Sequence, residues 1–514
     1  MKSRIYLPNL SPLTWLIILC AAAKFAIHMY SAPEYGLFFD ELYTIALSRH
    51  LAFGYVDLPP LVPALVALSR AMLGDSVFAY RIFPALAGAA TLVLVSLITM
   101  EFGGKAFAVL LSAIGFIAGP IWLGVNSIFC YDGFDQLVLA AFLYVLVRFL
   151  RSGNQRLWIL LGVIAGIACL TKMTILFLGP GFLVALLISK YRRDLLKPWP
   201  WLGAAICLVV VSPYLLWQVA NGWPTLEYWT NYSSFRVYKA SLPEYLTNLV
   251  VYLGTLLLPL WLVGLYRIFR RFHGVDYSFL GLLLATTLAL MFMLHSSTRM
   301  LVELFMPILA AGAVFIEELS TRVRWEKWIR AGAVGYLLIA GVLSALTSLP
   351  ILPIKDAKTI AFSLAPLNPP IKEFRGLTFY ISPMLSGKLG WDEFVQEVAK
   401  VYDALPPEER AIAGIYTDWY STAGSIDELG PKHGLPNAVS GALTYYLWGP
   451  GYSWDVMIIV SSHLSSVTNF FEECELKKTV EHYYDVPVGS PSIYLCRKPT
   501  TSPDGIWTDL KFYD

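Results

Sequence analysis

Long apolar stretches separated by short polar connections dominate the first two thirds of the chain. A helix needs about 20 mostly apolar residues to cross a membrane. Stretches that approach this length lie near 10–30, 81–101, 106–124, 132–150, 157–171, 173–190, 201–219, 248–268, 278–295, 300–317 and 328–349. The pattern therefore predicts a polytopic α-helical membrane protein with about eleven transmembrane helices.

The fifth and sixth stretches form one continuous apolar segment that Lys172 interrupts. A charge at the bilayer centre costs about 3 kcal/mol on insertion scales. Two short helices that meet at the membrane boundary near Lys172 avoid this cost, so we predict a helix break there. The first stretch is too long for a cleavable signal peptide and carries Lys24 and His28, so we expect it to remain as the first helix.

Lysine and arginine residues are sorted between alternate connections. With the N-terminus placed inside, the inside segments hold 17 of them and the outside connections hold 7, over more residues. Because positive charge concentrates on the cytoplasmic side, we expect a multi-pass plasma (inner) membrane protein with a cytoplasmic N-terminus. An odd number of spans then places residues 350–514 on the periplasmic or extracellular side.

This topology divides the chain into a transmembrane domain over 1–349 and a C-terminal extracytoplasmic domain over 350–514. Residues 31–80 form a long first outer loop. We expect its two amphipathic stretches, near 41–52 and 60–73, to lie along the membrane surface. An aromatic-rich second outer loop covers 220–247.

The C-terminal domain opens with five prolines between residues 350 and 370, which predicts an extended linker. Beyond them, helical and strand patterns alternate, as is typical of a small α/β unit. The pattern predicts helices near 391–404 and 464–474 and strands near 411–416, 455–461 and 492–497. On an oxidising side of the membrane, Cys474 and Cys496 would be able to form a disulfide. Two unrelated thiols fit the sequence equally well.

Composition agrees with a membrane protein and removes several classes of function. Charged residues make up 14% of the chain, against about 25% in soluble domains, and mean hydropathy is +0.60. No His/Cys spacing typical of a metal site and no glycine-rich phosphate-binding motif occurs. Basic residues lie in short connections, where topology explains them. We therefore expect no metal, no nucleotide hydrolysis and no nucleic-acid partner.

Carboxylates gather at the predicted outer boundary. Asp40 and Glu41 open the first outer loop, and adjacent residues on a helix do not share a face, so they are not an acid/base couple. Asp132 and Asp135 begin the fourth span on one helix face. A structural interpretation stays open for each group: Asp40 as a helix N-cap, and the later pair as charges placed favourably at a helix N-terminus.

Three basic residues, Lys172, Arg299 and Lys24, are predicted near the same boundary. They are compatible with snorkelling to lipid headgroups, and arginine also suits bidentate binding of phosphate. Carboxylates beside cations at one membrane boundary suit a substrate that is both lipid-anchored and phosphorylated.

Six ordered motifs at these positions carry a resemblance to a known group. They are Phe39-Asp40-Glu41-Leu42-Tyr43, Gly54–Leu61 with Asp57, Asp132-Gly133-Phe134-Asp135, Leu170-Thr171-Lys172, Trp217–Glu227, and Ser297-Thr298-Arg299 followed by Phe305-Met306-Pro307. In this order they resemble the GT-C superfamily of membrane glycosyltransferases, within it the protein O-mannosyltransferase and lipid A aminoarabinose transferase (ArnT-like) group. The resemblance covers about residues 10–320. Relatives often have His at the position of Leu58 and Lys at that of Arg299.

The resemblance implies an inverting transfer of a sugar from a polyprenyl-phosphate donor to a protein, lipid A or envelope-glycan acceptor, with no obligate metal or other cofactor. Asp40 would be the general base, and Lys172 and Arg299 would neutralise the leaving phosphate. Asp132 or Asp135 would orient sugar or acceptor groups. Asp57 and Glu41 complete the candidate substrate-binding residues, with Glu41 expected to support the site rather than react.

Other interpretations remain. A transporter or flippase for a lipid-linked sugar would place ionisable groups near the bilayer midplane, whereas here they cluster at one boundary, which favours the enzyme. A non-catalytic assembly or scaffold protein is a third interpretation, and it predicts that Asp40→Asn has no effect on function. Residues 416–425 and 445–450 resemble C-terminal domains of bacterial relatives, and their aromatic residues fit either a sugar-facing surface or a packed core.

Overall fold

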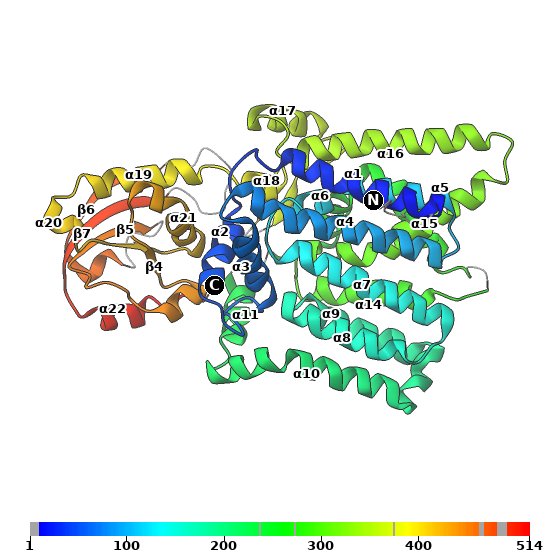
Figure 1. Cartoon of the computed structure of the whole chain (residues 1–514), viewed down its shortest axis with the longest axis horizontal. Coiled ribbons are helices and arrows are strands. Elements are labelled where there is room, and N and C mark those ends of the chain that lie inside the picture. The colour runs from blue at the N-terminus through cyan, green and yellow to red at the C-terminus, as the bar shows by residue number, and fades with distance from the viewer. Residues whose placement is uncertain are drawn as a thin grey trace, which may run out of the picture.

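The computed structural model describes residues 10–235, 238–271, 274–373, 376–461, 467–480 and 491–513. A bundle of long helices and a smaller domain built on a β-sheet lie end to end (Figure 1). The bundle contains α1 (Pro12–Ser31), α4 (Val77–Glu101), α5 (Ala106–Ala118), α6 (Pro120–Val125), α7 (Tyr131–Ser152), α8 (Leu157–Thr171), α9 (Thr174–Ile188), α10 (Pro198–Ala220), α12 (Leu242–Leu253), α13 (Leu258–Ile268), α14 (Ser278–Met293), α15 (Met306–Ser320) and α16 (Glu326–Ser348), with 3-10 helices η1 (Lys190–Leu196), η2 (Thr255–Leu257) and η3 (Thr298–Phe305).

Helices lie at every position predicted to span the membrane. Within the described ranges, six are long and apolar enough to cross a membrane by themselves, and up to eight spans result if each of two bent pairs counts as one. The helices α5, α8 and α14 are apolar but shorter. The chain is thus a multi-pass membrane protein, and the number eleven stays a prediction.

Glycine and proline break two of the predicted spans, and a charge separates two others. Gly119 and Pro120 separate α5 from α6 within 106–124. Gly254, at φ +94°, separates α12 from η2 and α13, and this pair bends by 86°. Lys172 lies in extended conformation between α8 and α9, which confirms the break predicted there.

Small residues let some helices of the bundle approach one another closely. A Cβ at Gly203 of α10 would lie 2.3 Å from the carbonyl oxygen of Trp158 in α8. A Cβ at Gly264 of α13 would lie 2.0 Å from that of Ile308 in α15. Membrane helices associate through such close packing because lipid offers no hydrophobic driving force between them.

The charged connections predicted to be inside gather at one end of the bundle. The α4–α5, α7–α8 and α15–α16 connections lie at the end away from the C-terminal domain (Figure 1). There Glu101 contacts Arg151 at 2.8 Å and Arg148 at 3.5 Å. The opposite end, which we call the domain-side end, carries α2 (Phe39–Arg49) and α3 (Leu61–Leu73). Which compartment each end faces remains a prediction.

Only one of the two amphipathic stretches has an exposed apolar face. On α3, Leu68, Met72 and Leu73 are exposed, as suits a helix on a membrane surface. On α2, every residue from Glu41 to Ser48 is buried. The expectation that α2 lies along the membrane surface is therefore wrong, because the C-terminal domain covers it.

The C-terminal domain has a five-stranded mixed sheet in the order β4-β3-β5-β7-β6. Strands β3, β4 and β5 are parallel, and β7 is antiparallel to both β5 and β6. The strands are β3 (Gly414–Thr417), β4 (Ala438–Ser440), β5 (Val456–Ser461), β6 (Phe471–Thr479) and β7 (Ser492–Pro499), and a separate antiparallel pair is formed by β1 (Ile371–Glu373) and β2 (Leu377–Phe379). The helices are α17 (Ile354–Leu364), α18 (Pro383–Ser386), α19 (Trp391–Asp403), α20 (Pro407–Arg410), α21 (Tyr420–Leu429) and α22 (Pro503–Asp509), with η4 (Gly430–His433), η5 (Leu443–Trp448) and η6 (Thr468–Phe470).

Alternate residues of β5 pack on opposite faces of this sheet, as the pleat requires. Ile458 and Val460 belong to the core that contains α19 and α21. Met457 and Ile459 pack with Trp454 and Trp507 on the other face. The predicted helix near 391–404 and the three predicted strands are confirmed as α19, β3, β5 and β7.

Two predictions in this region are wrong. A helix is predicted near 464–474, but residues 471–479 form strand β6. Residues 462–466 lie outside the described residues. Most of β6 is exposed, and buried and exposed positions do not alternate along it. Its sequence therefore has no strand pattern. The predicted linker contains helix α17, which Pro353 precedes. Cys474 and Cys496 are paired across β6 and β7 and form a disulfide, which confirms the first of the two alternatives.

Candidate active site

A cavity of about 800 Å³ opens between the domain-side end of the bundle and the C-terminal domain. Its walls come from α2, the α8–α9 connection, η3, the turn after β3 and the aromatic helix α11 (Pro224–Phe235). Four of the predicted site residues line it: Asp40, Asp57, Lys172 and Arg299. Segments separated by more than 300 residues thus meet in one place.

Asp40 lies in the first turn of α2, which begins at Phe39. The N-cap position belongs to Phe38, and the carboxylate of Glu41 accepts a hydrogen bond from the Phe38 N–H at 2.7 Å. The N-cap interpretation of Asp40 is therefore wrong. Its carboxylate lines the cavity instead, where Oδ1 accepts a hydrogen bond from the hydroxyl of Tyr420 at 2.9 Å.

Asp57 is held by the same helix. Its Oδ1 accepts a hydrogen bond at 2.8 Å from the hydroxyl of Tyr43, one turn after Asp40. Burial and the nearby Asp57 carboxylate raise the pKa of Tyr43 well above its usual value, so the hydroxyl stays a donor. The same hydroxyl accepts from the N–H of Thr444 at 3.2 Å, which joins Asp57 to the C-terminal domain.

Lys172 reaches the cavity from the α8–α9 connection. Its Nζ lies 2.6 Å from Oδ1 of Asp132 in the first turn of α7 and 4.9 Å from the ring centroid of Tyr131. Burial lowers the pKa of Lys172, but the carboxylates of Asp132 and Asp135 outweigh that effect, and the net shift is upward. The amino group is therefore a permanent positive charge at the cavity wall.

Arg299 of η3 lies on the same cavity. Ser297, two residues earlier, donates a hydrogen bond at 2.5 Å to Oε1 of Glu373 on β1. Glu373 also lines the cavity and interacts electrostatically with Arg299. The sequence offered no signal for Glu373, because it follows the proline-rich stretch and belongs to no recognised motif.

Three other candidates do not line the cavity. Glu41 is fully buried, pairs with Arg81 and accepts from the Phe129 N–H at 2.5 Å, so the prediction that it binds substrate is wrong and its expected supporting role fits. Asp132 and Asp135 are also buried. Neither lines the cavity, so their predicted contact with sugar or acceptor stays untested, and Asp132 contacts the cavity-lining Lys172 at 2.6 Å.

Lys24, the remaining basic candidate, is fully buried in α1 and donates a hydrogen bond to the carbonyl oxygen of Trp122 at 2.9 Å. It does not belong to the cavity wall. The cations that reach the cavity from the bundle are thus Lys172 and Arg299 among the predicted residues.

Side chains from α11 and the C-terminal domain, most of them aromatic, complete the cavity. From α11 come Tyr228, Trp229 and Tyr232, and from the C-terminal domain come Tyr416, Asp418, Trp419 and Tyr420. The cavity-facing interpretation therefore fits residues 416–420. Tyr445, in contrast, is buried in the domain core, so the packing interpretation fits that stretch.

The sequence is similar to a known protein family and to a curated protein. Residues 57–217 match the family described as dolichyl-phosphate-mannose-protein mannosyltransferase. The lipid A galacturonosyltransferase RgtD of Rhizobium johnstonii is 25% identical over 225 residues, which cover 43% of this chain and 46% of that protein. The chain thus matches less than half the length of this curated relative.

Solved structures share the fold along almost the whole chain. The crystal structure of ArnT from Cupriavidus metallidurans bound to undecaprenyl phosphate superimposes with a TM-score of 0.58, at 13% identity, over 94% of this chain and 98% of that one. The apo structure of the same protein gives 0.56 at 15% identity, with the same coverage. The chain therefore has the ArnT fold.

Proposed function

We propose that this chain is an inverting glycosyltransferase that moves a sugar from a polyprenyl-phosphate donor to an acceptor on the outer face of the membrane. The observation that carries this proposal is the cavity in which the carboxylate of Asp40 and the cations Lys172 and Arg299 meet at one end of a membrane bundle. A carboxylate can activate an acceptor, and fixed cations can stabilise a leaving phosphate.

The reaction is a single displacement. An acceptor hydroxyl or phosphate oxygen attacks the anomeric carbon of the donor sugar. Where the nucleophile is a hydroxyl, Asp40 takes its proton. The bond between the anomeric carbon and the phosphate oxygen breaks, and the electron pair leaves with the polyprenyl phosphate. Lys172 and Arg299 neutralise that charge, and attack from the opposite side inverts the anomeric configuration. As the resemblance implies, the proposed mechanism needs no obligate metal ion.

The walls of the cavity suit both parts of the donor. Phe177, Phe292 and Leu294 offer apolar surface on the bundle side, where an isoprenoid chain would enter from the membrane. The phosphate would follow at Lys172, whose charge is fixed by Asp132. The sugar would then lie beside Asp40 and Asp57, whose carboxylates accept hydrogen bonds from hydroxyl groups.

The acceptor class stays open among protein, lipid A and envelope glycan, and the outer-face orientation rests on the charge sorting described above. An acceptor would approach from the C-terminal domain, because that domain forms the wall opposite the bundle. Its cavity-facing residues Asp418 and Trp419 combine a carboxylate with an aromatic ring.

The test is sugar transfer by the purified protein. It is incubated with a panel of radiolabelled polyprenyl-phosphate sugars and an extract of the host envelope, and the label is followed into product. Transfer from one donor, with inverted anomeric configuration in the product, supports the proposal. If no donor is consumed and labelled donor crosses the bilayer of reconstituted vesicles instead, the flippase function replaces it.

Replacing Lys172 with methionine is expected to lower kcat by about 10²–10³-fold, the usual cost of removing one preorganised charge from a developing anion. The loss would also leave Asp132 buried without its partner, which destabilises the fold. The variant Lys172→Met/Asp132→Asn removes both charges and separates the two effects. It should recover thermal stability but not kcat. Lys172→Arg should keep most of the activity, and full activity in the neutral pair would exclude Lys172 from phosphate stabilisation.

A further inference from the structure

We propose that Tyr420 of the C-terminal domain is a positioning residue for Asp40. The hydroxyl of Tyr420 donates to Oδ1 of Asp40 at 2.9 Å, across 380 residues of sequence. The inference rests on the proposed function, because it assigns Tyr420 a role through the carboxylate that acts as base.

The fold of the C-terminal domain explains why this residue faces the bundle. Strand β3 lies between β4 and β5, to both of which it is parallel, so the order of parallel strands changes direction at β3. Open α/β sheets bind ligands beyond the carboxyl ends of strands at such a point. The turn after β3 carries Asp418, Trp419 and Tyr420, all of which line the cavity.

Local contacts fix the turn that presents Tyr420. The N–H of Asp418 donates to the carbonyl of Val460 at 3.2 Å, and its Oδ2 accepts from Ser461 at 2.8 Å, so β5 holds the turn. The ring of Tyr420 lies between two others, with its centroid 5.1 Å from that of Trp419 and 4.8 Å from that of Tyr43. Its hydroxyl is therefore aimed by both the sheet and α2.

One face of α21 is built to lie against α2. Residues four and eight positions after Tyr420 share its face, and these are Gly424 and Glu428. A Cβ at Gly424 would lie 2.8 Å from the carbonyl oxygen of Leu42, so only glycine permits this approach. Tyr420 thus contacts the first turn of α2 while Glu428 reaches Arg49 at its end.

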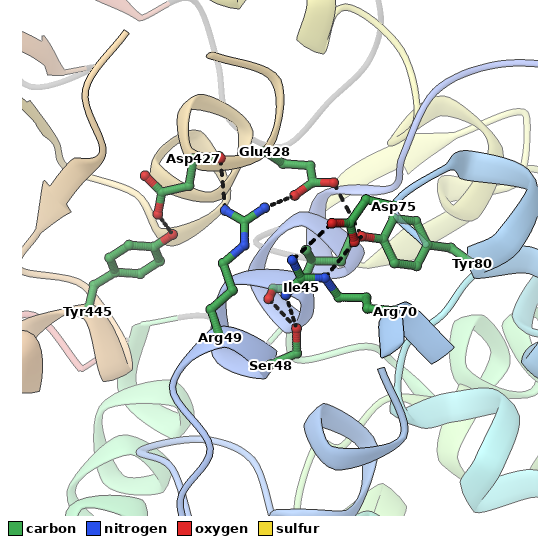
Figure 2. Close-up of polar contacts among 9 residues, drawn as sticks. All are labelled: Ile45, Ser48, Arg49, Arg70, Asp75, Tyr80, Asp427, Glu428 and Tyr445. Atoms are coloured by element: carbon green, nitrogen blue, oxygen red, sulfur yellow. Dashed lines mark hydrogen bonds and ion pairs between the residues drawn. The ribbon is translucent and has the colours of Figure 1, made fainter. Parts of the chain in front are cut away.

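A network of charges closes the far end of this contact (Figure 2). Arg49 of α2 donates to the carbonyl of Asp427 at 2.9 Å and pairs with Glu428. Glu428 also accepts from Tyr80 at 3.3 Å, and Tyr80 donates to Asp75, which Arg70 contacts at 2.6 Å. Helices α2, α3 and α4 therefore all hold α21 in place.

These contacts give the C-terminal domain a function that packing alone does not require. A hydrogen bond from Tyr420 fixes one carboxylate oxygen of Asp40. The orientation of this carboxylate is therefore set before the acceptor binds. Preorganisation of this kind contributes to the rate and not to the affinity for the donor. Loss of the hydroxyl should therefore change kcat and leave donor binding alone.

The experiment compares Tyr420→Phe with Tyr445→Phe in the full-length protein. Both changes remove a buried hydroxyl that donates to a carboxylate at the α2–α21 contact, to Asp40 in one case and to Asp427, at 2.7 Å, in the other. Both rings remain to pack on Tyr43. Tyr420→Phe should lower kcat about tenfold, with the Kd for polyprenyl phosphate and the Tm near wild type. Tyr445→Phe should lower the Tm and leave kcat, measured below that Tm, near wild type.

The outcomes separate this inference from the proposed function. Wild-type kcat in Tyr420→Phe, while Asp40→Asn is inactive, would overturn the role of Tyr420 and keep the enzyme. Equal losses of Tm and kcat in the two variants would reduce Tyr420 to a packing residue and also overturn it. Undiminished transfer by Asp40→Asn would instead remove the proposed base, and the role of Tyr420 with it. A selective loss of kcat in Tyr420→Phe supports the inference.

Discussion

Asp40→Asn is expected to lower the rate of sugar transfer by about 10³-fold, within the range for loss of a general base. Asparagine is nearly isosteric, and its carbonyl oxygen can still accept the hydrogen bond that Tyr420 donates. The site should therefore keep its shape and lose only the ability to take a proton from the acceptor. The measurement is kcat with the identified donor, together with the Kd for polyprenyl phosphate, which should stay within about twofold of wild type because Lys172 and Arg299 are unchanged.

Asp57→Asn is the matched comparison, since Asp57 is the other carboxylate of the first loop on the same cavity. Its Oδ1 accepts from Tyr43, and an asparagine oxygen can do the same. We expect a smaller loss, seen mainly in KM, from weaker contact with sugar hydroxyls. If Asp57→Asn were inactive and Asp40→Asn retained activity, the base would be Asp57.

Glu41→Gln is expected to destabilise the protein by about 3–5 kcal/mol, the usual cost of breaking a buried ion pair from one side. Glu41 is fully buried and serves Arg81, the N–H of Phe38 and the N–H of Phe129. Without its charge, Arg81 would lose its buried counter-ion and would lie near the amino group of Lys388. Burial and Arg81 already lower the pKa of Lys388 well below its usual value. The Tm and the yield of folded protein in detergent measure the loss.

The double variant Glu41→Gln/Arg81→Met separates structure from chemistry. It removes the uncompensated charge, so its Tm should recover much of the loss, and the two changes should be strongly non-additive. Because Glu41 does not line the cavity, kcat per folded molecule should remain near wild type. A stable double variant without activity would show that Glu41 contributes to the reaction itself.

The matching positions of predicted and observed helices have a simple cause. A helix in lipid must satisfy its backbone within one segment, so hydrophobicity and length alone reveal it. Lys172 was informative for the same reason, because an apolar stretch tolerates a charge only at a break or boundary. The sequence does not predict the edge strand β6, because this strand has no buried face from which a pattern could arise.

The sequence motifs locate the candidate site residues, but they do not show which of two neighbouring residues lines the cavity. Asp40 and Glu41 are adjacent and chemically alike, yet one lines the cavity and the other is fully buried. Their difference follows from the rotation of α2, which turns successive side chains to different faces. Asp132 and Asp135 are predicted to share a helix face, but neither lines the cavity. Asp132 instead contacts Lys172, which does line it.

By itself the sequence determined the membrane class, the sorting of charge between two ends, and the carboxylate and cations of a candidate transferase site. These follow from local periodicity and from the cost of charge in lipid, which act on each segment separately. Only the tertiary structure decided that β3 and α21 place Tyr420 on Asp40, that Glu41 is a structural anion, and that Glu373 joins the cavity. Those outcomes depend on contacts between residues 40 positions apart for Glu41 and Arg81 and 380 apart for Asp40 and Tyr420, and no local pattern encodes which distant partner a side chain will meet.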